Sequence, residues 1–137
     1  MEEKEEWKDI PGYPDYQISN LGRVKSLTHT VYHSPSKKFP NGRFVTYKER
    51  ILKTALENGG YEFVVLYKNK VKRSFRIHRL VAKLFISNPN NFEQVNHKDE
   101  NKTNNKVSNL EWCTAKYNIN YGTGKYRKTF NRRVPVI

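Results

Sequence analysis

The sequence predicts a small α+β fold, with a β-rich N-terminal portion and a β-loop-β-helix unit towards the C-terminal end. Three observations lead to this class. Apolar and polar residues alternate over residues 7–27, as in half-buried strands, and two short β-type runs lie at 61–67 and 71–77. Residues 78–86 carry apolar side chains at helical spacing. The 137 residues suffice for one domain with a modest core.

The first element is a compact β unit over Trp7–Leu27. Its turn segment IPGYPDY is followed by YQISNLGRVKSL, in which apolar and polar residues alternate around a turn at Asn20-Leu21-Gly22. Arg23 and Lys25 are expected to point outward from this unit.

The middle of the chain is expected to supply further strands. Residues 28–48 hold prolines and a polar run without periodicity, which predicts a long loop or an irregular hairpin. Glu49–Thr54 is predicted to be a short strand. Tyr61–Tyr67 and Val71–Ile77 are predicted to pair as strands joined by a turn at Lys68-Asn69-Lys70.

One helix is predicted at His78–Ile86, because its apolar residues share one helical face, and Asn88-Pro89 is expected to end it. His78 heads that face. A satisfied packing role is therefore favoured for its imidazole over a chemical one.

Residues 94–118 are predicted to begin a separate small unit. Residues 95–97 can form a short strand, Leu110–Cys113 a returning strand, and Thr114 the N-cap of a helix that carries Asn118. This arrangement places an imidazole near two amide oxygens. Such a group can bind one hard divalent ion, with water and phosphate oxygens completing its shell.

The charge composition indicates a polyanionic partner. Lys and Arg outnumber Asp and Glu by 26 to 13, and all but two of these basic residues follow Gly22. No apolar run approaches the roughly 20 residues that span a bilayer, and the N-terminal segment lacks secretory features, so an intracellular protein without a membrane partner is expected. Cys113 is the single cysteine, which excludes intramolecular disulfides and zinc clusters of the CxxC type.

Three blocks of the sequence carry a resemblance to a known family. IHRLVAKLF followed by VNHKDENKTNNKVSNLEW resembles the ββα-metal motif of HNH endonucleases, in particular phage intron-encoded homing endonucleases. WKDIPGYPDYQISNLGRVKSL resembles the small module that often precedes this motif in that subgroup. The resemblance covers residues 7–27 and 61–120, and three blocks in the same order are more specific than any one.

The resemblance implies a role for each matched residue. His97 matches the general base that deprotonates the attacking water, and Asn109 matches the asparagine that holds the loop and orients the histidine. Asn96 and Asn118 match the positions that ligate one divalent ion, Mg²⁺ or Mn²⁺. Hydrolysis of a phosphodiester would then leave 5′-phosphate and 3′-hydroxyl ends. A monomer is expected, and its one site favours nicking, whereas a dimer could cut both strands.

Two positions depart from the family pattern. Some relatives have aspartate where this chain has Asn96, so the site loses one negative charge. Glu100 stands where the pattern usually has glycine, and it would strain the loop if that position has a positive φ.

Double-stranded DNA is the expected partner. A two-stranded ribbon fits the major groove, so the strands within residues 61–77 are the preferred groove-facing element. Residues 1–60 are expected to form a β-rich DNA-binding module, 61–120 the ribbon, helix and nuclease motif, and 121–137 a basic tail. The candidate phosphate contacts are Arg23, Lys25, Arg73, Arg76, Lys125, Arg127 and Lys128.

Two other functions remain open at the level of sequence. A catalytically degenerate DNA-binding protein of the same family would keep the fold without cleavage. An RNA-binding structural protein is disfavoured, because no aromatic RNA platform is recognisable. If the gene is phage-encoded, the expected location is the cytoplasm of the bacterial host.

Overall fold

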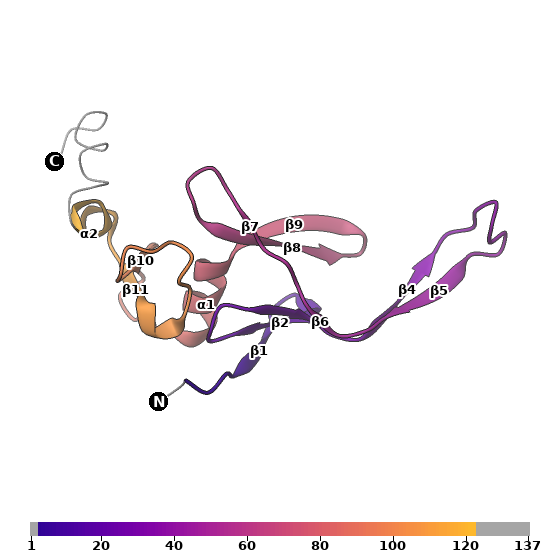
Figure 1. The fold of residues 1–137 in the computed structure, drawn as a ribbon, viewed down its shortest axis with the longest axis horizontal. Helices are drawn as coiled ribbons and strands as arrows, with labels where there is room; N and C mark the ends of the chain where they lie inside the picture. The colour runs from indigo at the N-terminus through magenta and orange to yellow at the C-terminus, as the bar shows by residue number, and fades with distance from the viewer. Residues whose placement is uncertain (1–2, 123–137) are drawn as a thin grey trace.

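The computed structural model describes residues 3–122. All of the strand pairs in this part of the chain are antiparallel. Figure 1 shows that most elements gather into one body, from which a single hairpin extends along the long axis of the molecule. No helix within residues 3–122 is long and apolar enough to cross a membrane.

The first sheet confirms the predicted β unit at residues 7–27. Its strand order is β1-β2-β3-β6. The strands are β1 (Trp7–Ile10), β2 (Tyr13–Ser19), β3 (Val24–Ser26) and β6 (Arg50–Ile51). Gly22 lies in the β2–β3 turn with φ +85°, a conformation that favours glycine. The strand expected over Glu49–Thr54 is thus shorter than predicted, because only Arg50 and Ile51 pair with β3.

The extended hairpin consists of β4 (His29–His33) and β5 (Arg43–Tyr47). The two strands pair in register from His29–Tyr47 to His33–Arg43. Of the two possibilities for residues 28–48, the hairpin is therefore right. We call residues 29–47 the arm (Figure 1).

A three-stranded sheet contains the predicted ribbon. It is formed by β7 (Ala55–Leu56), β8 (Glu62–Lys68) and β9 (Val71–Arg76). Asn69 and Lys70 form the β8–β9 turn with φ values of 52° and 64°. Two consecutive positive φ values are typical of a two-residue hairpin turn. The ribbon is confirmed, with Lys68 in the strand and Ile77 already in the next helix.

The remaining elements are α1 (Ile77–Phe85), β10 (Gln94–His97), the 3-10 turn η1 (Val107–Asn109), β11 (Leu110–Cys113) and α2 (Ala115–Asn120). Helix α1 ends at Phe85, before the Asn88-Pro89 stop expected from sequence. Thr114 caps α2 as predicted, since its side chain accepts a hydrogen bond from the Tyr117 backbone N–H at 3.1 Å.

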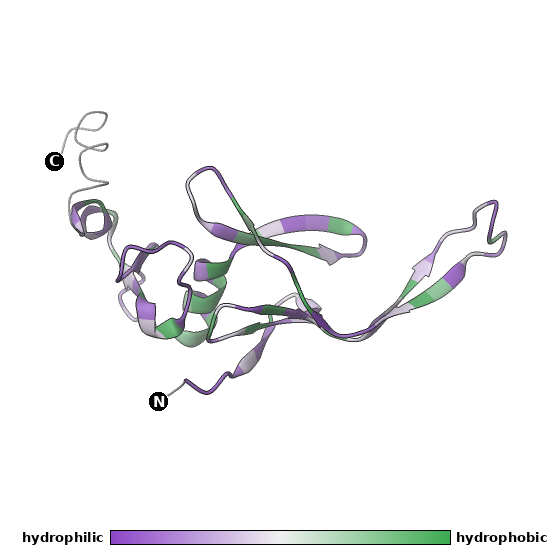
Figure 2. Cartoon of the chain, viewed as in Figure 1, coloured by the Kyte–Doolittle hydropathy of each residue, from purple (hydrophilic) through white to green (hydrophobic). Residues whose placement is uncertain are grey.

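One hydrophobic core joins all parts of the body. It combines Ile18 and Val24 of the first sheet, Leu66 of β8, Val81 of α1, and Val95 and Leu110 of the β10–β11 hairpin. Figure 2 shows the apolar character of α1 and of the strands around it. The expectation that residues 94–118 begin a separate unit is therefore wrong, because Val95 and Leu110 are buried in the same core as the N-terminal sheet.

Candidate active site

Strand β10 and helix α2 border a pocket of about 400 Å³. His97, Asn96 and Asn118 all line it, so the structure brings three of the predicted site residues to one hollow. Tyr61, Glu100, Lys102 and Tyr121 complete much of its polar and aromatic wall. Asn109 lies outside the lining, in η1.

Asn109 closes the loop that follows His97. Its Oδ1 accepts a hydrogen bond from the Asp99 backbone N–H at 3.1 Å. Its Nδ2 donates to Asp99 Oδ1 at 2.9 Å and to the Asn104 carbonyl at 2.8 Å. Asn109 therefore holds the loop, but it makes no direct hydrogen bond to the imidazole of His97.

The direct partner of His97 is Asn105. His97 Nε2 and Asn105 Oδ1 are 2.7 Å apart, and both residues are buried. Asn105 Nδ2 donates in turn to Glu62 Oε1 at 2.8 Å. The hydroxyl of Thr54 donates to the other carboxylate oxygen of Glu62 at 2.6 Å.

Sequence reasoning missed both Asn105 and Glu62. The Asn104-Asn105 pair was visible within the motif, but asparagine in a turn-rich stretch is commonly explained by backbone geometry. Glu62 lies 43 residues before Asn105, and no local pattern links the two. Only the packing of β8 against the loop that follows His97 brings Glu62 to Asn105.

His97 is packed among aromatic rings. The centroid of its ring lies 5.1 Å from that of His78 and 6.0 Å from that of Tyr61. Burial lowers the pKa of His97, and Lys102 adds to this, while the hydrogen bond to Asn105 and the charge of Asp99 oppose it. His97 is thus favoured as a neutral imidazole at neutral pH.

His78 is buried, and its ring stacks on Tyr61 with the centroids 4.9 Å apart. Burial lowers its pKa to about 3, with the charges of His97 and Arg79 acting in the same direction. Its Nδ1 has no hydrogen-bond partner within residues 3–122. The packing role expected for His78 is borne out, but the expectation that its imidazole is satisfied is wrong for Nδ1.

The two amide side chains of the pocket are each fixed by a bond from their NH₂ group. Asn96 Nδ2 donates to Glu111 Oε2 at 2.7 Å, and Asn118 Nδ2 donates to Gln94 Oε1 at 3.3 Å. Neither Oδ1 atom accepts a hydrogen bond from the described residues. Both amide oxygens therefore remain available to bind a cation or to accept a hydrogen bond.

This donor set fits a hard divalent cation. Amide oxygens ligate Mg²⁺ and Mn²⁺, and the carboxylate of Glu111, across the strand pair from Asn96, adds a negative charge nearby. Within residues 3–122, no three His, Cys, Asp or Glu side chains are grouped to hold a metal. Asn96 and Asn118 are the residues that would hold an ion at this place.

Glu100 has a positive φ, the conformation that would explain why the family pattern usually has glycine at this position. Its φ is 64°, in the left-handed region, which costs a non-glycine residue about 1–2 kcal/mol. Its backbone N–H donates to the His97 carbonyl at 2.9 Å, so the strained residue closes a tight turn directly after the imidazole.

Several predicted phosphate contacts already have acidic partners. Arg23 binds Glu5, Lys25 lies 3.9 Å from Glu49, and Arg76 lies 2.6 Å from Glu57. Arg73 is exposed, with its guanidinium 5.5 Å from the ring centroid of Phe75, and it has no ion pair within residues 3–122. Lys125, Arg127 and Lys128 lie outside the described residues.

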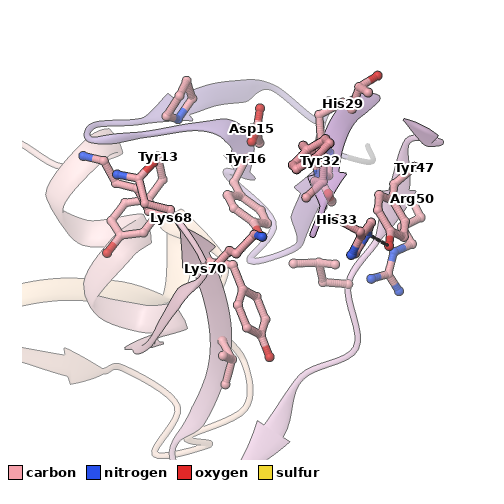
Figure 3. Close-up of a pocket in the computed structure, with 18 residues that line it drawn as sticks. Tyr13, Asp15, Tyr16, His29, Tyr32, His33, Tyr47, Arg50, Lys68 and Lys70 are labelled. Carbon is pink, nitrogen blue, oxygen red and sulfur yellow. Dashed lines mark hydrogen bonds between the residues drawn. The ribbon is translucent and has the colours of Figure 1, made fainter. Parts of the chain in front are cut away.

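A second and larger hollow, of about 830 Å³, lies between the base of the arm, β2 and the β8–β9 turn. Figure 3 shows its aromatic and basic walls, including the hydrogen bond between His33 Nε2 and the Tyr47 hydroxyl at 3.1 Å. It shares no lining residue with the pocket at His97. Its labelled side chains include Tyr16, Tyr32, Tyr47, Arg50, Lys68 and Lys70.

Two family models match the chain in succession. Residues 5–67 match the NUMOD4 motif, and residues 75–119 match the HNH endonuclease model. The uncharacterized HNH endonuclease L245 of Acanthamoeba polyphaga mimivirus is 39% identical over 129 residues, which cover 93% of this chain and 33% of that protein. The DNA endonuclease I-HmuI of Bacillus phage SP01 is 36% identical over 115 residues, or 83% of this chain and 55% of that protein.

A solved structure shows the same likeness. It is described as DNA binding and cleavage by the HNH homing endonuclease I-HmuI, and it matches with a TM-score of 0.59 and 32% identity over 92% of this chain and 66% of that one. The H-N-H endonuclease F-TflII of Escherichia phage T5 is 33% identical over 77% of this chain and 46% of that protein. The chain thus spans between about a third and just over half of these curated relatives.

Proposed function

This chain belongs to the HNH endonuclease family, and from that premise we propose that it hydrolyses phosphodiester bonds of double-stranded DNA with one divalent ion, Mg²⁺ or Mn²⁺. The observation that carries the proposal is the pocket in which the imidazole of His97 lies with two amide oxygens, of Asn96 and Asn118, that are left uncommitted.

In this proposal His97 is the general base. Its buried ring favours the neutral form, which can accept a proton from the attacking water. Asn109 keeps the following loop closed through Asp99 and Asn104. When bound by Asn96 and Asn118, the ion supplies charge stabilisation at the phosphate and at the departing 3′ oxygen. The products would be 5′-phosphate and 3′-hydroxyl ends.

DNA binding is assigned to the basic surface of the β-rich part. Arg73, Lys68 at the end of β8 and Lys70 of the β8–β9 turn are exposed on the ribbon. The arm and its base add five exposed basic residues that have no ion pair within residues 3–122, namely Lys37, Lys38, Arg43, Lys48 and Arg50. Arg23, Lys25 and Arg76 would have to exchange their carboxylate partners for phosphates, and the tail residues Lys125, Arg127 and Lys128 are proposed as further phosphate contacts.

We assign the parts of the chain as expected from the sequence: residues 1–60 form a β-rich DNA-binding module, 61–120 the ribbon, the helix and the nuclease motif, and 121–137 a basic tail. A chain with one active site would cut one DNA strand. A monomer at the DNA is therefore proposed, and double-strand cleavage would need a second copy or a second visit.

The test is conversion of supercoiled plasmid to nicked circle in Mg²⁺ or Mn²⁺, compared with EDTA. End-labelled duplexes would then show whether 5′-phosphate ends form. DNA binding without conversion would instead support the catalytically degenerate protein. The uncharged Asn96 and the strained Glu100 are the two observations that favour that rival.

A further inference from the structure

We propose that Glu62 and Asn105 are positioning residues that fix the tautomer of His97, with the proton on Nε2 and the lone pair on Nδ1. This inference rests on the proposed role of His97 as general base. It assigns a role in the reaction to Glu62, which lies within residues 5–67 that match the NUMOD4 motif rather than within the HNH match.

The chemistry of the donors and acceptors leaves one arrangement. A carboxylate only accepts hydrogen bonds, so the group of Asn105 that lies 2.8 Å from Glu62 Oε1 must be the NH₂. The amide oxygen then faces His97 Nε2 at 2.7 Å. Because that oxygen only accepts, Nε2 must carry the proton. Nδ1 is then the only ring nitrogen with a lone pair for a water proton.

The series of hydrogen bonds from Glu62 through Asn105 to His97 is held in place at both ends. The Thr54 hydroxyl donates a hydrogen bond to the second carboxylate oxygen of Glu62 at 2.6 Å. The backbone of Glu62 is fixed because it pairs with Leu56 of β7. On the other side, a Cβ at Gly22 would meet Asn105 Cβ at 3.0 Å and the Asn105 carbonyl oxygen at 3.1 Å. Asn105 is thus packed between the first sheet and β8. With Asn105 3% and His97 5% exposed, water is a poor substitute for these bonds.

The alternative is a purely structural clamp, in which Glu62 and Asn105 only hold the loop. The two roles differ in what they predict for the ring. A clamp leaves the tautomer of His97 unaffected as long as the protein is folded, whereas a positioning role ties the tautomer to the acceptor at residue 62.

The deciding measurement is the tautomer of His97 in the full chain, read from long-range ¹H–¹⁵N correlations of its ring nitrogens at neutral pH without metal. We expect the wild type to carry the proton on Nε2. Glu62→Ala and Asn105→Leu should give a mixture of tautomers. Glu62→Gln should keep the wild-type tautomer of His97, because the introduced amide oxygen can still accept a hydrogen bond from Asn105. Glu93→Ala, which removes an exposed carboxylate near β10, is the matched control.

Cleavage kinetics supply the second readout. Loss of a partner that orients a reactive group typically costs about 10- to 100-fold, so kcat of Glu62→Ala should fall by this factor with little change in KM, and Glu62→Gln should recover most of it. A proton on Nδ1 in the wild type would overturn the inference, as would an unchanged tautomer and kcat in folded Glu62→Ala. If the wild type does not cleave DNA at all, the proposed function fails, while the tautomer measurement still decides this inference.

Discussion

The pocket at His97 and the arm differ in how their polar groups are satisfied. In the pocket, His97, Asn96 and Asn118 each already bind another side chain of the protein. In the arm, basic side chains are exposed without acidic partners within the described residues, and Phe44 is 73% exposed. A reacting group has to be oriented before the substrate arrives, whereas a binding surface can take its partners from the ligand.

The two regions also differ in their relation to the core. The pocket is built on Val95 and Leu110, which are buried in the common core, while no residue of the arm belongs to it. Changes in the pocket should therefore affect activity and stability together. Changes in the arm should affect binding alone.

The largest expected effect is at the pocket. His97→Ala should lower metal-dependent cleavage by about 10²- to 10⁴-fold, because the proton acceptor is removed, with DNA affinity nearly unchanged. It should also destabilise the fold by roughly 1–3 kcal/mol, since Asn105 Oδ1 loses its buried partner. Plasmid nicking, gel-shift binding and urea unfolding would measure the three quantities. Near wild-type cleavage by this variant would contradict the mechanism.

A second test concerns the pH dependence of stability. The pKa of His78 is about 3 in the folded protein and about 6.5 when unfolded, so the unfolded state binds more protons between these values. The contribution of His78 should leave the free energy of unfolding unchanged above about pH 6.5. It should lower that free energy by about 2 kcal/mol at pH 5 and by about 4 kcal/mol at pH 3. His78→Phe should remove that loss. Urea unfolding at pH 7.5 and pH 5 gives the loss of unfolding free energy between these pH values for each protein. An equal loss in the wild type and in His78→Phe would show that His78 is not buried in its neutral form.

The arm should change affinity without changing stability. Replacing Lys37, Lys38 and Arg43 with Gln should weaken DNA binding and make the salt dependence shallower by about 0.9 for each phosphate that is no longer neutralised. Lys83→Gln, exposed on α1, is the control. Affinity measured between about 50 and 200 mM salt would give the slope, and thermal unfolding should show no shift. An unchanged slope would place the DNA-binding surface elsewhere on the molecule.

The smallest expected effect is at Asn96. Asn96→Asp should lower the half-saturating metal concentration several-fold, because a carboxylate is a stronger ligand for Mg²⁺ and Mn²⁺ than an amide. It would also place two carboxylates together, since Asn96 Nδ2 now lies 2.7 Å from Glu111 Oε2. The metal-free variant should therefore be less stable than the wild type, and metal should raise its Tm more. An unchanged metal dependence of Tm would remove Asn96 from the set of ligands.

Local patterns predicted most of the fold. Alternation indicated the β2–β3 and β8–β9 pairs, helical spacing indicated α1, and an N-cap residue marked the start of α2 at Thr114. These signals act over a few residues. The register of the arm was not predictable, because both faces of its strands mix apolar and polar residues, so no single buried face specifies the pairing.

The placement of the candidate site residues was predicted where the motif is continuous, and contacts that depend on the fold were missed. His97, Asn96 and Asn118 lie together as expected. The Glu62–Asn105 bond and the ion pair between Arg76 and Glu57 join distant segments, so neither could be inferred from spacing. Burial of Val95 and Leu110 in the common core was missed for the same reason.

Gly22 limits how genes of this kind can be recombined. The β2–β3 turn approaches the loop that follows His97 so closely that a Cβ at residue 22 would lie 3.0 Å from Asn105 Cβ, and Val107 N donates to the Asn20 carbonyl at 2.9 Å beside it. A crossover between residues 67 and 75 would separate the two sides of this packed junction. Chimeras that join an unrelated N-terminal half to residues 75–122 should therefore lose stability when the incoming turn carries a residue larger than glycine at the matching place.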